Sequence, residues 1–188
     1  MLPQAEVVFV GEQAGPVTND HGSLQLVAEA ALSDVRSPDI VLVPGGPGQN
    51  DQMTDGPVHE WLRAADTTST WTTSVCTGSL ILAAAGLLTG RRATSHWLAR
   101  EHLCRFGVEA TSQRVVFDGK HVTAAGVSAG IDMALALVGR IAGDAAAQAS
   151  QLMLEYDPQP PYDAGSPATA PPQLRERLQR SSRPVVTS

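Results

Sequence analysis

Apolar residues occur along the chain in short runs that alternate with longer segments of helical periodicity. The short runs, which predict strands, are Val7–Val10, Ile40–Val43, Thr72–Val75 and Val122–Thr123. The longer segments, which predict helices, lie near residues 57–66, 77–86, 96–106, 130–142 and 144–154. Because strands that alternate with helices pair in parallel, the pattern predicts an α/β fold with a mostly parallel sheet.

Two segments also predict where their strands lie in the sheet. Ile40–Val43 is apolar at every position, which predicts a central strand buried on both faces of the sheet. Residues 115–123 contain two strand-like runs around Asp118-Gly119, which predicts a hairpin at the sheet edge.

After Tyr156 the chain is rich in proline and then in polar residues. Residues 1–170 are therefore expected to form one domain, and 171–188 a loosely ordered tail.

The segment from Thr72 to Gly86 predicts a strand that turns sharply at Cys76 and continues as a helix. Ser74 and Gly78 are small enough for the two backbones to pass closely, so the turn has the character of a nucleophile elbow with the cysteine at its tip. The start of the helix is expected to lower the pKa of the thiol. The alternative is that Cys76 is a small buried hydrophobic residue.

A glycine-rich loop, Pro44–Gly48, follows the predicted central strand. Its glycines allow main-chain N–H groups to approach a ligand, so the N–H groups of Gly46 and Thr77 are candidates for an oxyanion hole beside the cysteine. Taken alone, such a loop is more often an ordinary turn, and its pairing with the turn at Cys76 is what favours a functional role.

Composition narrows the classes of function. The chain has 188 residues with 43% hydrophobic content, enough for one domain with a core. A net charge of −6 without a basic cluster argues against nucleic acid or an anionic membrane as a partner. No apolar stretch approaches the roughly 20 residues that span a bilayer, and the N-terminus does not resemble a signal peptide.

The two cysteines, Cys76 and Cys104, cannot form a disulfide framework, and a cytoplasmic protein with both thiols reduced is expected. Cys104 lies within a helical pattern, which favours a structural role. His96, His102 and His121 show no metal-ligand spacing, and no metal or organic cofactor is expected.

Several segments in combination resemble the ThiJ/PfpI superfamily, within the class I glutamine amidotransferase-like fold. They are Val43–Gly48, Ser74–Ser79, Ala83–Trp97 and Ala125–Asp132. Glu155–Pro167 is similar to the isonitrile hydratase branch. The resemblance implies a flavodoxin-like three-layer sandwich and a homodimer. It also implies a lyase that adds water to a small isonitrile to give an N-substituted formamide, with Cys76 as the nucleophile.

The same resemblance implies that the first unit of the fold is missing. Proteins of this superfamily open with a strand and a helix that usually carry an acidic residue reaching the cysteine. Here the match begins at Ala5–Val10, which looks like the second strand. The loss of an interior strand would leave strand edges unpaired and apolar surface bare. It would also leave the catalytic acid unassigned.

Further residues are candidates for a supporting role. Thr77 stands where several related branches have histidine, which fits the hydratase branch, although threonine is also ordinary in a first helical turn. His96 follows a strand where the superfamily often places an active-site histidine, but a packed histidine explains it equally. Ser128 is a candidate helix cap, and helix-dipole complementarity is sufficient to explain Asp132. Gly45 and Gly78 are expected to line the site.

Two other functions remain open. A glutathione-independent glyoxalase or deglycase would use the cysteine against an aldehyde, and it predicts a nearby acid and histidine. A stand-alone sensor would be related to the N-terminal half of AraC-type transcriptional regulators, with Cys76 as the residue that becomes oxidised. The residues after position 155 are too few for a DNA-binding module.

Overall fold

Four strands form the central sheet, in the order β5–β6–β10–β9. The computed structural model describes residues 5–19 and 21–181. The strands are β5 (Ile40–Val43), β6 (Trp71–Val75), β9 (Val115–Asp118) and β10 (His121–Ala124). β6 runs parallel to both β5 and β10, whereas β9 is antiparallel to β10. The predicted α/β class, the last three predicted strands and the 115–123 hairpin are therefore confirmed.

The apolar sequence of β5 predicts a strand at the centre of the sheet. The structure instead places β5 at the edge. Among the residues that the structure describes, β6 is the strand that pairs with it, and its outer edge has no strand partner. Ile40 and Leu42 are exposed on one face, while Val41 and Val43 are buried on the other. An apolar run thus predicts the strand but not how many of its sides are covered.

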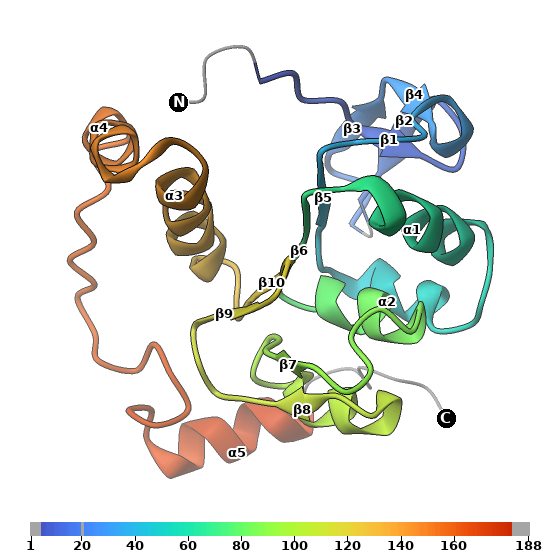
Figure 1. Ribbon diagram of the computed structural model, residues 1–188. Coiled ribbons are helices and arrows are strands. Elements are labelled where there is room, and N and C mark those ends of the chain that lie inside the picture. Colours follow the sequence, from blue (N-terminus) through green and yellow to red (C-terminus); the bar gives the residue numbers. More distant parts are fainter. Residues whose placement is uncertain (1–4, 20, 182–188) are drawn as a thin grey trace.

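Two small strand pairs lie outside the central sheet near the N-terminal end (Figure 1). They are β1 (Val10–Gly11) with β4 (Ala30–Ala31), in parallel, and β2 (Gly15–Thr18) with β3 (Gln25–Ala28), antiparallel. The predicted strand Val7–Val10 is wrong before Val10. Phe9 instead donates its N–H to Glu29 Oε2 at 3.1 Å, so a side chain satisfies the group that a neighbouring strand would have bound.

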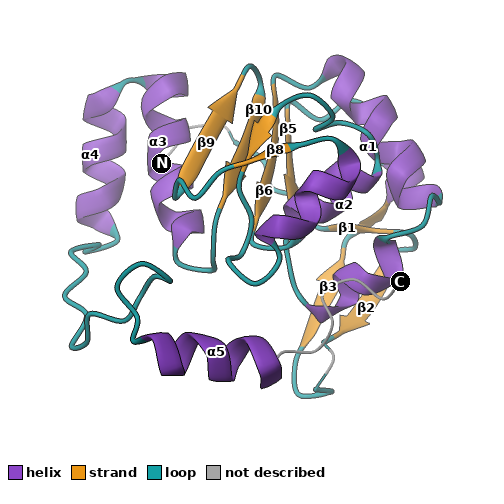
Figure 2. Cartoon of the chain, turned by 90° about the horizontal axis from the view of Figure 1, so that it is seen from below, coloured by secondary structure: helices purple, strands orange, loops and turns teal. Residues whose placement is uncertain are grey.

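Helices cover both faces of the sheet, as Figure 2 shows. The α-helices are α1 (Pro57–Thr68), α2 (Gly78–Ala84), α3 (Ala129–Ala142), α4 (Asp144–Met153) and α5 (Pro172–Ser181). α1 and α2 lie on one face and α3 on the other, with α4 packed outside α3. Three layers result, as expected for a flavodoxin-like fold. Within the described ranges, no helix is long and apolar enough to cross a membrane.

Shorter elements complete the chain. They are the 3-10 helices Leu32–Asp34, Pro47–Gln52 and Arg100–Phe106, and the parallel strands β7 (Arg92–Ala93) and β8 (Glu109–Ala110). The predicted helix over 96–106 is therefore only partly correct. Its first residues form a turn in which the N–H groups of Ala99 and Arg100 both donate to the His96 carbonyl.

The C-terminal part is more ordered than its composition predicts. Figure 1 shows the chain leaving α4 as an extended segment that leads to α5, on the side of β7 and β8. Leu174 and Leu178 of α5 line a small pocket with Trp97, so the helix packs on the domain. The prediction of a loosely ordered tail from residue 171 is wrong for Pro172–Ser181, and residues 182–188 lie outside the described residues.

Candidate active site

Cys76 occupies the turn between β6 and α2 in a strained backbone conformation. Its φ is 59°, in the left-handed region that residues with a side chain seldom adopt. β6 ends at Val75 and α2 begins at Gly78, so strand and helix are separated by only two residues. The predicted strand, turn and helix around Cys76 are therefore present, and the thiol is half-buried at the turn.

Hydrogen bonds on both sides hold Cys76 in this conformation. Its N–H donates to the carbonyls of Ala124, at 3.1 Å, and Ala125, at 2.8 Å. Its own carbonyl accepts the Ser79 hydroxyl at 3.2 Å and the Ser95 hydroxyl at 3.0 Å. A strained backbone persists only where the surroundings over-determine it, and these four contacts do so. The direction in which the Cα–Cβ bond of Cys76 points is fixed as a result.

Two glycines make this turn sterically possible. A Cβ atom on Gly78 would lie 2.2 Å from the Val43 carbonyl oxygen, and one on Gly45 would lie 2.5 Å from the Thr77 nitrogen. Neither distance is compatible with a side chain. Val43 and Ser74 are in register in the parallel pair β5–β6, so the loop after β5 and the turn after β6 emerge together. This close approach brings the glycine-rich loop against Cys76.

The loop supports Thr77 and does not present a free amide of Gly46. The Gly46 N–H donates to Thr77 Oγ1 at 2.9 Å, and the Thr77 hydroxyl lies 3.4 Å from the Gly46 carbonyl oxygen. The predicted oxyanion role of the Gly46 N–H is therefore corrected, because this donor is already bound. Thr77 keeps the predicted position next to the sulfur.

The electrostatics of the thiol differ from the prediction. Burial raises the pKa of Cys76 above its ordinary value of 9.0, and hydrogen bonds from the backbone and hydroxyl of Thr77 only partly oppose it. The predicted lowering of the thiol pKa is therefore wrong, because burial shifts the pKa of Cys76 in the opposite direction.

His96 lies near the site but is not hydrogen-bonded to the cysteine. Its Nδ1 accepts the Leu98 N–H at 3.4 Å, and its Cδ2 is 3.5 Å from where a Cβ on Gly126 would lie. Burial lowers the pKa of His96 below 6.5, so its imidazole is neutral at neutral pH. The structure therefore brings His96 to the loop that follows β10, which in turn accepts the N–H of Cys76.

Ser128 is predicted to cap α3, but its side chain makes no capping hydrogen bond. Its hydroxyl instead accepts a hydrogen bond from Arg114 Nη2 at 3.1 Å. Asp132 in the same helix accepts Arg114 Nε through one oxygen and the Tyr156 hydroxyl, at 2.7 Å, through the other. Burial acts to raise the pKa of Asp132, but these two donors outweigh it and hold the pKa below its usual value. Helix-dipole complementarity alone therefore does not account for Asp132.

Sequence reasoning missed Ser79, Ser95 and Arg114, since serine and arginine at such positions carry no distinctive signal. Cys104 is exposed and free, so a buried structural role is wrong for it. Among residues 5–19 and 21–181, no group of three or more His, Cys, Asp or Glu residues could hold a metal ion. In the same part of the chain, no carboxylate is hydrogen-bonded to Cys76. The groups on its sulfur, amide and carbonyl are hydroxyls and backbone.

Comparison with known proteins identifies relatives of this arrangement. The sequence model of the DJ-1/PfpI family matches residues 3–140. Isonitrile hydratase from Pseudomonas putida is 42% identical over 185 residues, which are 98% of this chain and 81% of that protein.

Two further Pseudomonas proteins are similar to the chain. The crystal structure of a THiJ/PfpI family protein from Pseudomonas syringae superposes with a TM-score of 0.89 at 40% identity, covering 93% of this chain and 73% of that chain. The HTH-type transcriptional regulator CdhR from Pseudomonas aeruginosa is 35% identical over 133 residues, which are 69% of this chain but only 38% of the regulator.

Proposed function

Because the chain belongs to the DJ-1/PfpI family, we propose that it is a cysteine-dependent hydro-lyase that converts an isonitrile to an N-substituted formamide. The observation that carries the proposal is Cys76, held at a φ of 59° by four hydrogen bonds at the end of β6. The similarity of the chain to isonitrile hydratase, over 98% of its length, supports this chemistry over the other reactions of a nucleophilic cysteine.

The first step is addition of the thiol to the terminal carbon of the isonitrile. Burial raises the pKa of Cys76 and so favours the thiol form, in which the same side chain supplies both the sulfur and the proton. A sulfur–carbon bond forms, the S–H bond breaks, and the proton ends on the isonitrile carbon. The product is a neutral thioimidate, which needs no further acid.

The second step is hydrolysis of that thioimidate. Water adds to the carbon, the nitrogen takes a proton, and the sulfur–carbon bond then breaks to release the formamide and restore the thiol. Negative charge develops on oxygen before the sulfur leaves, and we assign its stabilisation to the backbone N–H and hydroxyl of Thr77, which are hydrogen-bonded to the Cys76 sulfur. Gly46 contributes by holding Thr77 Oγ1 at 2.9 Å.

The test is formamide production from cyclohexyl isocyanide, followed by proton NMR. We expect turnover by the unaltered chain and a loss of at least about 10³-fold in kcat for Cys76→Ala, because the nucleophile is removed. Cys104→Ala is the matched control, since it removes the exposed cysteine, and it should retain full activity. Intact-mass spectrometry should show an adduct with the mass of the isonitrile on Cys104→Ala but not on Cys76→Ala.

Equal turnover in Cys76→Ala would refute the mechanism. Consumption of methylglyoxal without hydration of the isocyanide would assign the site to the glyoxalase or deglycase class. Loss of both activities, with selective oxidation of Cys76 by dilute peroxide, would favour the stand-alone sensor.

A further inference from the structure

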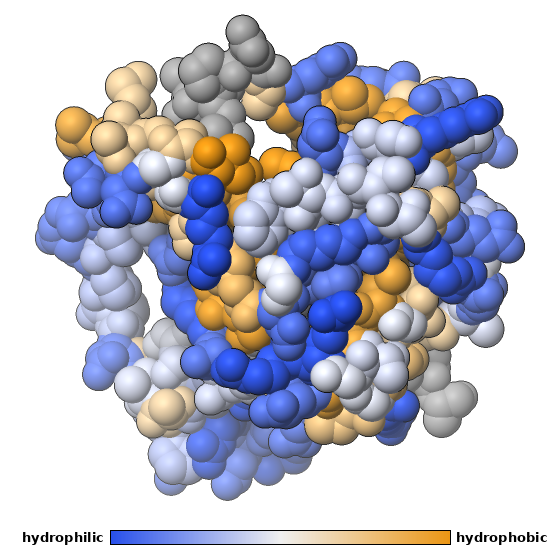
Figure 3. Space-filling view, viewed as in Figure 1, coloured by the Kyte–Doolittle hydropathy of each residue, from blue (hydrophilic) through white to orange (hydrophobic). Residues whose placement is uncertain are grey.

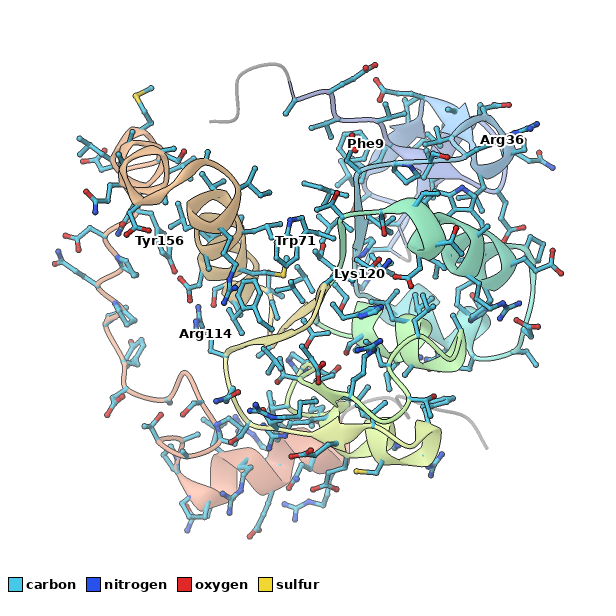
Figure 4. The ribbon with its side chains drawn as sticks, viewed as in Figure 1. Phe9, Arg36, Trp71, Arg114, Lys120 and Tyr156 are labelled. Atoms are coloured by element: carbon cyan, nitrogen blue, oxygen red, sulfur yellow. The ribbon has the colours of Figure 1, made fainter. Side chains whose placement is uncertain are left out.

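Tyr156 begins a chain of polar contacts that ends at Ser128, in the loop between β10 and α3. Its hydroxyl donates to Asp132 Oδ1 at 2.7 Å, Asp132 Oδ2 accepts Arg114 Nε, and Arg114 Nη2 donates to Ser128 Oγ at 3.1 Å. Figure 4 shows the side chains of Tyr156 and Arg114 between α3 and the extended C-terminal segment. The contacts therefore join the start of that segment to α3, to the residue before β9 and to the loop between β10 and α3.

This loop contacts the active-site turn directly. Ala125, its first residue, accepts the Cys76 N–H at 2.8 Å and donates its own N–H to the Arg114 carbonyl at 2.9 Å. A Cβ on Gly130, at the start of α3, would lie 3.2 Å from Val75, the residue that precedes Cys76. Arg114 thus holds the loop twice, through its main chain at Ala125 and through its side chain at Ser128.

Apolar packing does not fix the outer part of the loop. Val127, between Gly126 and Ser128, is 81% exposed. The Arg114 side chain is 51% exposed and that of Asp132 32%, and ion pairs with this degree of exposure add little to the stability of a fold. The polar contacts therefore have more effect on where the loop lies than on whether the domain folds.

We propose that Tyr156 is a positioning residue for the reaction, which sets the place of the Gly126–Ser128 loop beside Cys76 through Asp132 and Arg114. The assignment rests on the proposed function, because only a reaction at Cys76 gives the loop's position a catalytic consequence. Displacement of the reacting groups by a fraction of an ångström is sufficient to slow such a reaction, whereas affinity depends on it less.

The test is Tyr156→Phe, which removes only the hydroxyl, with Tyr162→Phe as the matched control. Tyr162 is the other tyrosine of the chain, and it is exposed. We expect Tyr156→Phe to lower kcat for cyclohexyl isocyanide about tenfold with KM little changed, and to leave the thermal unfolding midpoint close to that of the control.

A second readout does not depend on the isonitrile reaction. In a Cys104→Ala background, alkylation of Cys76 by iodoacetamide is followed against pH. A loosened loop admits water to the thiol, so Tyr156→Phe should alkylate faster at neutral pH and with a lower midpoint pH than the control. If the unaltered chain does not hydrate the isocyanide but Tyr156→Phe still shows this shift, the proposed function is refuted, while the effect of Tyr156 on the surroundings of Cys76 is supported.

Asp132→Asn tests whether the contacts act as one unit. Combined with Tyr156→Phe, it should slow the reaction by little more than the larger single effect, because both changes break the same connection. Additive effects would overturn the proposal. So would a Tyr156→Phe variant that matches Tyr162→Phe in kcat and alkylation, or one whose only change is a lower unfolding midpoint.

Discussion

The two faces of the central sheet differ in how completely helices cover them, and β5 shows the difference within four residues. Toward α1 and α2, Val41 and Val43 are 4% and 8% exposed. Toward α3, Ile40 and Leu42 are 39% and 57% exposed. Because strand side chains alternate between faces, four apolar neighbours divide into a buried pair and an exposed pair.

The face of the sheet that α1 and α2 cover is called the covered face, and the turn at Cys76 leads directly into it. α2, which follows Cys76, is buried along almost its whole length, and its side chains share a core with Val41, Val43 and Leu62. On the other face, α3 covers β10 through a smaller cluster that includes Val122 and Met133, but Leu42 lies beyond it. Apolar surface is visible around α3 and near the N-terminal strands in Figure 3. Equal hydrophobicity in the sequence therefore corresponds to unequal contributions to stability.

The largest expected effect sharpens this contrast. Leu80→Ala, in the fully buried part of α2, should lower the free energy of unfolding by about 3 kcal/mol, because it loses burial and leaves a cavity. Leu42→Ala makes the same chemical change on the exposed side and should cost less than about 1 kcal/mol. Urea denaturation followed by circular dichroism measures both. Equal losses would show that Leu42 is buried in solution, and the contrast between the faces would fail.

A smaller effect is expected where α2 passes closest to β5. Gly78→Ala places a Cβ 2.2 Å from the Val43 carbonyl oxygen, so the turn must move, and we expect a loss of about 2 kcal/mol together with reduced reactivity of Cys76. Gly48→Ala is the control, because a Cβ there meets no atom within 4 Å and should change stability by about 0.5 kcal/mol at most. A Gly78→Ala variant as stable and reactive as this control would contradict the steric argument.

Local signals predicted the parts of the molecule that neighbouring residues determine. The turn at Cys76 and the β9–β10 hairpin depend on small residues and a turn within a few positions, and both are present. The Ser95 hydroxyl reaches the Cys76 carbonyl across 19 positions, and Tyr156 reaches Asp132 across 24. Such contacts depend on how the helices and strands pack against one another, and no pattern along the sequence predicts them.

The error over the thiol pKa has a related origin. The sequence shows a helix after Cys76, but it does not show how much water the fold removes from the sulfur. Desolvation depends on residues from several distant elements, and in this structure it outweighs the hydrogen bonds from Thr77.

The covered face also contains a buried titratable pair at the end of the sheet away from Cys76. His121 Nε2 lies 3.1 Å from Asp66 Oδ1, which also accepts the Thr72 hydroxyl at 2.6 Å and lies 3.3 Å from Lys120 Nζ (Figure 4 labels Lys120). Burial lowers the pKa of His121 below 6.5, with the charges of Arg91 and Lys120 acting in the same direction and Asp66 opposing. Burial acts to raise the pKa of Asp66, but its hydrogen bonds and cationic neighbours hold it below 3.8.

Both His121 and Asp66 should lower the free energy of unfolding in acid, and this is the smallest of the expected effects. A histidine whose folded pKa is lowered contributes fully above its unfolded pKa, and the contribution is lost as the pH falls through the folded pKa. The free energy of unfolding should therefore decrease from pH 7.5 to pH 5, a window above the titration of Asp66. His121→Gln, which does not titrate, should flatten that decrease, as measured by urea denaturation at each pH. An unchanged slope in His121→Gln would place the pH dependence on another group and remove His121 from the contrast between the two faces.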